Sequence, residues 1–135
     1  MLLLLFPFLL ASTSIEDNSS INFKKDNLDE VTTQAQKENK PYFVDFYAQW
    51  CKACFEMDYK TFRDPTLTSY VNSNYVASKL HAQSFDGISL SQQHNINAFP
   101  AILIFDARGN LKEKLIGYQT ADRLLERLKV AAVSN

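Results

Sequence analysis

Residues 45–58 read DFYAQWCKACFEMD and contain the only two cysteines of the chain, Cys51 and Cys54. The residues at 42–47 are mostly aromatic or β-branched, which is typical of a buried strand. No Gly or Pro follows Cys51 until Pro65, so a helix is predicted to begin at the cysteine pair. The pair therefore lies where a strand passes into a helix, and the rest of the chain is expected to form its scaffold.

The position of Cys51 at a helix N-terminus favours its thiolate form, because unpaired backbone N–H groups and the helix dipole stabilise negative charge there. Trp50 and Lys52 flank this cysteine and are predicted to modulate it, Lys52 by its positive charge. The thiolate is the species that attacks a disulfide. We therefore predict that Cys51, as the more exposed cysteine, is the nucleophile and that Cys54, about one turn later, resolves the mixed disulfide.

Two cysteines are also compatible with a structural disulfide, a zinc site or haem attachment. A bridge across two residues removes little entropy from the unfolded chain, so it would stabilise the fold poorly. Zinc needs further ligands, and the only histidines, His81 and His94, are far apart in sequence. Haem attachment needs a histidine directly after Cys54, where Phe55 stands. The spacing favours a redox pair that needs no metal or other cofactor.

The segment VDFYAQWCKAC, residues 44–54, resembles the active-site segment of the thioredoxin superfamily. Its continuation, FEMDYKTFRDPTLTSYV at 55–71, is more similar to the periplasmic C-terminal domain of the disulfide-interchange protein DsbD and its single-domain relatives than to classical thioredoxins. The resemblance covers residues 21–133. It implies an α/β thioredoxin fold, with a central mixed β-sheet flanked by helices in the order βαβ then ββα. It also implies thiol-disulfide oxidoreductase activity.

The resemblance implies roles for three ionisable residues. Asp45 matches the buried acid of thioredoxins that exchanges a proton with the resolving thiol, and burial should raise its pKa toward neutrality. The alternative is that strand alternation points Asp45 to solvent. Asp58 matches an acid that influences the cysteines, although it could equally be a solvated charge on a helix face. Lys79 matches a lysine that tunes the buried acid, and is otherwise an ordinary edge cation.

A Phe-Pro pair at 99–100 precedes an apolar stretch predicted to be a strand. On statistics alone its peptide bond should be trans, since only about one in twenty X-Pro bonds in folded proteins is cis. The resemblance implies instead a cis-Pro100 opposite the cysteines. It also implies that the backbone of Phe99 binds the substrate chain in a strand-like contact.

Capping residues and turn residues predict the remaining elements. These are a short strand at 21–23, a helix from Leu28 to about Asn39 capped by Asn27, a strand at 42–47, a helix from the cysteines to a break at 64–65, a helix at 65–72, a strand at 75–80, a loop at 84–87, a short helix at 88–94, a hairpin of strands at 101–105 and 111–116, and a last helix capped by Thr120. No internal repeat or second domain is evident.

The composition fits a single globular domain, because 135 residues with 46% hydrophobic content can bury a sizeable core. Its lysines and arginines are scattered among nearly equal numbers of acids, for a net charge of -1. No basic stripe is present that would follow a phosphate backbone, so nucleic-acid binding is not expected. We expect a monomer that acts on client proteins with disulfides and receives electrons from an upstream thiol donor, such as a membrane protein.

The direction of electron flow depends on the two residues between the cysteines. Lys-Ala is closest to the Val-Ala of the DsbD-like domain, which favours a reductase of protein disulfides. Lys52 argues for the opposite direction, because a stabilised thiolate makes a protein more oxidising. The alternatives are an oxidant or isomerase with the same chemistry, and a peptide-binding module in which the cysteines are incidental.

The N-terminus differs from the rest of the chain, because Leu2 to Ala11 is almost wholly apolar and a small, polar segment follows at 12–14. Such a run is too short to span a bilayer but suits a signal-peptide core. No Lys or Arg precedes Lys24, so the usual positive segment is missing, and a longer precursor or a buried N-terminal element remains an alternative. We assign residues 1–14 to a signal peptide, 15–20 to a flexible lead-in and 21–135 to the thioredoxin-like domain.

Cleavage after the small residues Ser12 and Ser14 predicts that the exported protein begins near Ile15. N-terminal sequencing of the protein from an exporting host tests this expectation. Retention of Met1 on soluble cytosolic protein would contradict export, whereas retention in the membrane fraction would indicate an uncleaved anchor.

Overall fold

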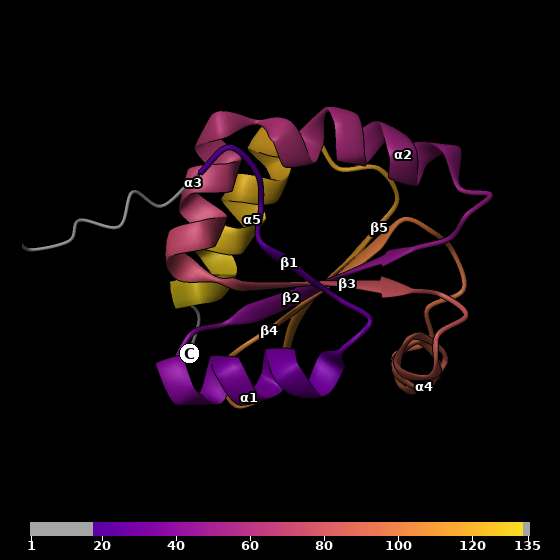
Figure 1. Cartoon of the computed structure of the whole chain (residues 1–135), viewed down its shortest axis with the longest axis horizontal. Coiled ribbons are helices and arrows are strands. Elements are labelled where there is room, and N and C mark those ends of the chain that lie inside the picture. Colours follow the sequence, from indigo (N-terminus) through magenta and orange to yellow (C-terminus); the bar gives the residue numbers. More distant parts are fainter. Residues whose placement is uncertain (1–17, 134–135) are drawn as a thin grey trace, which may run out of the picture.

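The computed structural model describes residues 18–133, which form a mixed five-stranded sheet with helices on both faces (Figure 1). The elements are β1 (Phe23–Lys25), α1 (Leu28–Glu38), β2 (Tyr42–Tyr47), α2 (Lys52–Tyr59), the 3₁₀ turn η1 (Thr61–Arg63), α3 (Pro65–Asn74), β3 (Val76–His81), α4 (Phe85–Gln93), β4 (Ala101–Phe105), β5 (Leu111–Ile116) and α5 (Ala121–Val133). The predicted thioredoxin fold, βαβ followed by ββα, is confirmed. Residues 1–17, which include the predicted signal peptide, lie outside the described residues.

Strand β2 lies at the centre of the sheet, whose strand order is β1-β3-β2-β4-β5. It pairs in parallel with β3 and antiparallel with β4. The parallel pairing needs a long crossover, which α2, η1 and α3 provide. Strand β5 returns antiparallel beside β4 after a turn in which Gly109 adopts a φ of +90°. Because β2 is the central strand, the cysteines that follow it lie at the edge of the sheet where β2 ends, with strands on both sides.

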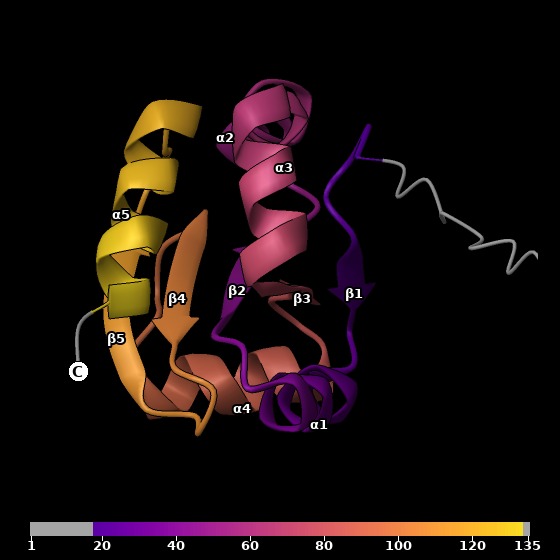
Figure 2. The same ribbon diagram turned by 90° about the vertical axis from the view of Figure 1, so that its left-hand side faces the viewer.

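The helices cover the sheet as two layers, α2, α3 and α5 on one face and α1 and α4 on the other (Figures 1 and 2). Because side chains alternate along a strand, each face of β2 supplies a separate apolar core. Phe43 packs with residues of α2, α3 and α5, whereas Val44 and Phe46 pack with residues of α1 and α4. Asp45 therefore shares the face of Phe43 and lies beneath α2.

The predicted helix caps are present. The side chain of Asn27 accepts a hydrogen bond from the Glu30 backbone N–H at 3.1 Å and donates one to the Glu30 carboxylate at 3.2 Å. Thr120 accepts from the Arg123 N–H at 3.3 Å. The bonds that Asn27 and Thr120 accept satisfy backbone N–H groups that a helix leaves unpaired in its first turn, so these caps explain where α1 and α5 begin.

The predicted loop at 84–87 is wrong, because this segment forms the first turn of α4. Ser84 caps the helix by accepting a hydrogen bond from the Gly87 N–H at 3.0 Å. Gly87 is not a turn residue but a close-packing residue, since a Cβ atom there would lie 2.0 Å from the His81 carbonyl oxygen. The strand predicted at 21–23 also lies two residues later, at β1.

We expect Leu128→Ala to lower the free energy of unfolding by about 2–5 kcal/mol, because Leu128 is fully buried between α5 and the sheet and its truncation leaves a cavity. Urea unfolding of the oxidised protein measures the change. Val130→Ala, on the exposed side of the same helix, should change it by no more than about 0.5 kcal/mol. Equal effects of the two substitutions would contradict this packing of α5.

Candidate active site

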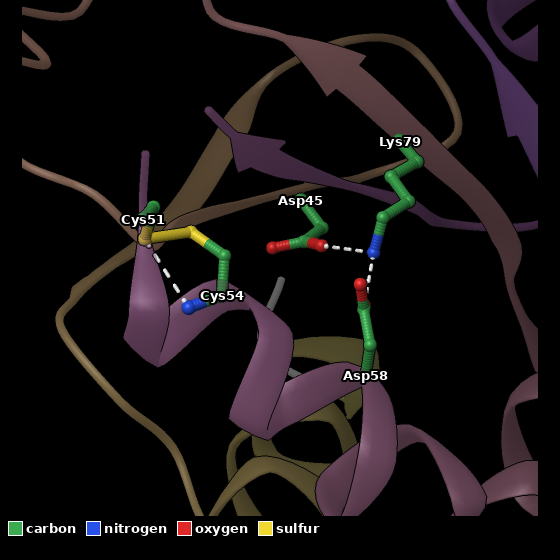
Figure 3. The surroundings of a disulfide bond; sticks show 5 residues. All are labelled: Asp45, Cys51, Cys54, Asp58 and Lys79. Carbon is green, nitrogen blue, oxygen red and sulfur yellow. Dashed lines mark hydrogen bonds and ion pairs between the residues drawn. A yellow bond between two sulfur atoms is a disulfide. The ribbon is translucent and has the colours of Figure 1, made fainter. Parts of the chain in front are cut away.

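Cys51 and Cys54 are joined by a disulfide at the start of α2, with their Cα atoms 5.3 Å apart (Figure 3). Cys51 is the N-cap residue of the helix, and its sulfur accepts a hydrogen bond from the Cys54 backbone N–H at 3.2 Å. A helix N-terminus presents unpaired N–H groups and the positive end of the helix dipole. After reduction, a negative charge on the Cys51 sulfur would be stabilised at this position.

The expectation that Cys51 is the more exposed cysteine is wrong for the disulfide form. Cys51 is 4% exposed and Cys54 is 5% exposed. The bond holds the two sulfurs together, and both residues pack in one cluster with Ala48 and Phe99. The position of Cys51 at the helix end, and not a difference in exposure, therefore distinguishes the two cysteines.

Asp45 lies on the central strand β2 and is only 3% exposed. The register of the sheet pairs it with Lys79 on β3, and the Lys79 Nζ atom lies 3.1 Å from the Asp45 Oδ2 atom. The alternative of a solvent-facing Asp45 is therefore wrong. The alternative of Lys79 as an ordinary edge cation is also wrong, because this lysine is 8% exposed and points beneath α2.

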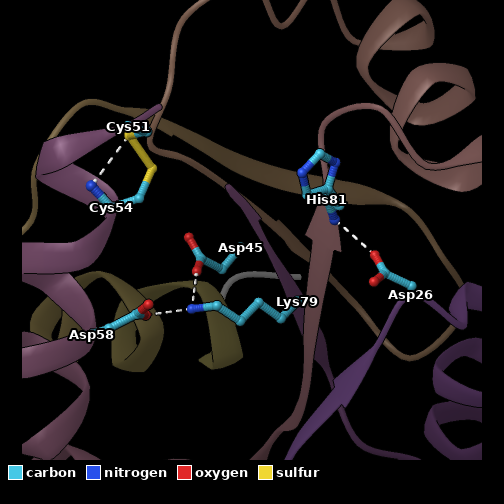
Figure 4. A network of polar contacts seen from close by, with 7 residues as sticks. All are labelled: Asp26, Asp45, Cys51, Cys54, Asp58, Lys79 and His81. Carbon is cyan, nitrogen blue, oxygen red and sulfur yellow. Dashed lines mark hydrogen bonds and ion pairs between the residues drawn. A yellow bond between two sulfur atoms is a disulfide. The ribbon is translucent and has the colours of Figure 1, made fainter. Parts of the chain in front are cut away.

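Asp58 extends the charge pair into a network of three residues (Figures 3 and 4). It lies one turn after Cys54 on α2 and accepts a second hydrogen bond from the Lys79 ammonium. Its side chain is 38% exposed, whereas that of Asp45 is 4% exposed. Asp58 is thus neither an isolated solvated charge nor a buried one, and it connects the interior of the network to the surface.

Burial dominates the protonation behaviour of this network. It raises the pKa of Asp45 to about 6, although the charge and hydrogen bond of Lys79 act to lower it, and the negative charge of Asp58 raises it further. Burial would lower the pKa of Lys79, but its two carboxylate partners outweigh this effect and raise it. Lys79 therefore stays charged while Asp45 exchanges its proton near neutral pH, as a general acid or base must.

Three aromatic rings surround the Lys79 ammonium, although the sequence analysis does not assign them to the site. Its Nζ atom lies 5.1 Å from the ring centres of Phe23 and Phe62 and 5.5 Å from that of Tyr47. The negative face of an aromatic ring attracts a cation. These residues come from β1, η1 and β2, so no local sequence pattern brings them together.

The Phe99–Pro100 peptide bond is cis, as the family resemblance implies. Phe99 packs against the cysteine cluster, and its ring forms a T-shaped pair with that of Trp50, with ring centres 6.1 Å apart. Trp50 is 74% exposed, and Lys52 is exposed at the first position of α2. The surface beside the disulfide therefore consists of one exposed aromatic ring, one half-buried ring and a cation.

Asp26, which lies between β1 and α1, fixes this part of the chain to the end of β3 near the disulfide (Figure 4). The Asp26 carboxylate accepts a hydrogen bond from the His81 backbone N–H at 2.7 Å, and the Asp26 N–H donates to the Lys79 carbonyl at 3.0 Å.

Between residues 18 and 133, no group of three or more His, Cys, Asp or Glu side chains is arranged to hold a metal ion.

A family of thioredoxin-like domains matches residues 28–132. A thiol:disulfide interchange protein DsbD from Citrobacter koseri is 30% identical over 102 residues, which is 73% of this chain and 18% of that protein. This chain thus spans about a fifth of the length of such curated relatives.

Two solved structures extend the similarity to three dimensions. The oxidised C-terminal domain of DsbD from Neisseria meningitidis superposes with a TM-score of 0.66 at 25% identity, over 77% of this chain and 92% of that one. The solution structure of a Bacteroides thetaiotaomicron protein, assigned provisionally as a disulphide isomerase, gives a TM-score of 0.75 at 26% identity, over 87% and 97%. Together with the matched domain and the disulfide at the start of α2, these similarities show that the chain belongs to the thioredoxin-like family.

Proposed function

We propose that the protein is a thiol-disulfide oxidoreductase that reduces disulfides in other proteins, with Cys51 and Cys54 as its redox couple. The observation that supports this most strongly is the disulfide at the N-terminus of α2, above a buried acid whose pKa lies near 6. A disulfide that only stabilised the fold would gain nothing from such an acid.

The first step is the attack of the reduced enzyme on a client disulfide. The Cys51 thiolate, stabilised by the helix N-terminus, bonds to one client sulfur and expels the other as a thiolate. The N–H of Cys54, which lies 3.2 Å from the Cys51 sulfur in the disulfide form, is in place to favour this charge. The product is a mixed disulfide between enzyme and client.

The second step releases the client. Asp45, as a carboxylate, accepts the proton of the Cys54 thiol, and the Cys54 sulfur then attacks that of Cys51. The second client sulfur leaves as a thiolate, so the client gains two electrons and the enzyme becomes the disulfide. Lys79 and Asp58 modulate the step by setting the charge around Asp45. An upstream dithiol, such as that of a membrane protein, then returns the enzyme to its reduced form.

The surface around the disulfide supports binding of an extended client segment. Phe99 and cis-Pro100 lie at the start of β4 beside the cysteine cluster, and Trp50 is exposed next to them. We propose that the backbone at Phe99 pairs with the client as an added strand and that the two aromatic rings cover apolar side chains of the client. Because this pairing uses hydrogen bonds to the client backbone, it tolerates many client sequences.

We place the protein outside the cytoplasm, as a monomer whose thioredoxin-like domain comprises residues 21–135. The apolar run at 2–11 supports export, and the relatives named as interchange proteins support a role in disulfide exchange. In the described part of the chain, no helix combines the length and the apolarity needed to cross a membrane.

The mechanism predicts different trapping behaviour for the two cysteines. Cys54→Ser keeps the attacking sulfur but removes the resolving one, so it should accumulate mixed disulfides with client proteins. Cys51→Ser should accumulate few, because the remaining sulfur lies inside the first turn of α2. Non-reducing gels with and without dithiothreitol measure the complexes.

Mass spectrometry of these complexes would identify the clients. Equal trapping by the two single variants would contradict the assignment of Cys51 as nucleophile. A double serine variant that still bound its partners, with no activity in the wild type, would favour the binding-module alternative.

Asp45→Asn should slow turnover by roughly 10²-fold or more at neutral pH, because the amide cannot accept the Cys54 proton. With a pKa of about 6, Asp45 is the active carboxylate above that pH and the inactive acid below it. The rate of client release should therefore rise through about pH 6 in the wild type, and this step should be absent in the variant. Stopped-flow measurements across this range, with Cys51 alkylation as the control, test the role. An unchanged rate and pH profile would show that Asp45 is structural.

A further inference from the structure

We propose that the outer face of α2, formed by the exposed side chains of residues 49–63, is the docking surface for an acidic, partly apolar segment of the dithiol protein that returns the enzyme to its reduced form. This inference rests on the proposed function and deepens it, because it gives the chemistry of the electron donor. The proposed client surface at Phe99 and Pro100 meets this face at Trp50, whose ring pairs with that of Phe99.

The outer face of α2 is open to solvent and rich in aromatic rings. Among residues 18–133, no other helix or strand covers this side of α2 (Figures 1 and 2). The exposed fractions of Trp50, Phe55 and Tyr59 are 74%, 50% and 65%. Apart from one glutamine, the exposed side chains of this segment are these three rings and three cations, Lys52, Lys60 and Arg63.

The exposed charges of this face are all positive. The two acids of the segment, Glu56 and Asp58, are half-buried, and Asp58 is paired with Lys79. The protein as a whole is not basic, since its net charge is -1. Helix α5, in contrast, exposes acids and cations together, namely Asp122, Arg123, Glu126 and Lys129. The positive sign of the α2 face is therefore local, and it is complementary to a partner surface that carries acids.

The aromatic rings indicate that the partner also buries apolar side chains here. Phe55 and Tyr59 are four residues apart on the helix, so their rings lie on the same side. The guanidinium of Arg63 lies 5.1 Å from the centre of the Tyr59 ring. Aromatic residues and Arg are enriched at protein interfaces. A carboxylate bound at Arg63 would thus lie beside a ring that can cover an apolar neighbour.

The fixed charge of the face suits the donor better than the clients. Clients differ in sequence, and we propose above that they bind through their backbone at Phe99. A row of cations would reject many of them, whereas one dedicated donor can carry a matching surface. The face begins beside Cys51, the N-cap of α2, so a protein docked on it has access to the disulfide.

The exchange that follows docking is balanced. One donor thiolate attacks the Cys51 sulfur, and Cys54 leaves as a thiolate that takes up a proton. The second donor thiolate then attacks the first donor sulfur and releases the Cys51 thiolate. The donor loses two electrons and becomes a disulfide, and the enzyme gains them as two thiols.

Helix geometry sets the spacing between the donor cysteine and its acids. A helix rises 1.5 Å per residue, so Lys60 lies about 14 Å along α2 from Cys51. An extended chain advances about 3.3 Å per residue, so about four to six residues reach from Cys51 to Lys60 and Arg63. We therefore place the acids of the donor at this distance from its attacking cysteine.

The test measures how fast dithiol peptides reduce the oxidised protein, by timed alkylation and mass measurement. The peptides share a Cys-Gly-Gly-Cys pair and a leucine, and differ in two side chains about five residues away, which are Glu, Gln or Lys. Each rate is divided by the rate of the same peptide with hydroxyethyl disulfide, which corrects for thiol reactivity. In about 0.01 M salt the acidic peptide should react about tenfold faster than the neutral one, and the preference should largely disappear in about 1 M salt.

Substitutions on the face should change this preference. Lys60→Glu with Arg63→Glu should remove it and make the basic peptide the fastest. Phe55→Ser with Tyr59→Ser should slow the acidic peptide at both salt concentrations, because salt does not screen apolar contacts.

The matched control is Lys37→Glu with Arg108→Glu, which changes the net charge equally at exposed positions on α1 and in the turn between β4 and β5. It should keep most of the preference. Dithiothreitol, which is uncharged, should reduce all of these variants at the wild-type rate.

Equal corrected rates of the acidic and neutral peptides with the wild type would overturn the docking surface, and so would equal losses in the control and the Lys60→Glu, Arg63→Glu variant. Without a peptide preference, binding to vesicles of phosphatidylglycerol and phosphatidylcholine that the latter variant abolishes would assign the face to a membrane instead. A wild-type disulfide that neither dithiothreitol nor any peptide reduced would refute the proposed function.

Discussion

The structure depends on one buried ion pair, between Asp45 on the central strand and Lys79 on its parallel neighbour. A lone carboxylate in an apolar core costs several kcal/mol or loses its charge, so this acid requires a partner within hydrogen-bond reach. The register of β2 and β3 supplies the partner. The same strand ends at Tyr47, shortly before Cys51, so the pairing of Asp45 also holds the acid beneath the disulfide.

The pair is balanced so that one member stays charged and the other titrates. Full burial holds the pKa of Asp45 near 6, and the charge of Lys79 keeps it from rising further. Asp58 shares the ammonium, and its negative charge raises the pKa of Asp45 further. Helix α2 carries both Cys54 and Asp58, one turn apart, so a single element connects the sulfur chemistry to the proton chemistry.

Local sequence signals were sufficient for three of the five strands. The bounds of β2, β4 and β5 agree with the predicted strands at 42–47, 101–105 and 111–116, because apolar runs with clear turn residues specify them. The start of α4 could not be predicted from Gly87, whose role is set by a backbone atom six residues earlier. Likewise, the rings of Phe23 and Phe62 meet at Lys79 only through tertiary packing. The cis bond at Pro100 could be predicted from the family resemblance but not from the Phe-Pro pair alone.

The central claim is that the bond between Cys51 and Cys54 is a redox couple and not a structural crosslink. A redox titration against glutathione, with alkylation and mass measurement of both cysteines, tests it most directly. The account predicts that the two thiols appear together at a potential between about −120 and −270 mV, in the reducing half of that range. A pair that remained oxidised below about −300 mV would behave as a structural disulfide and would contradict the account.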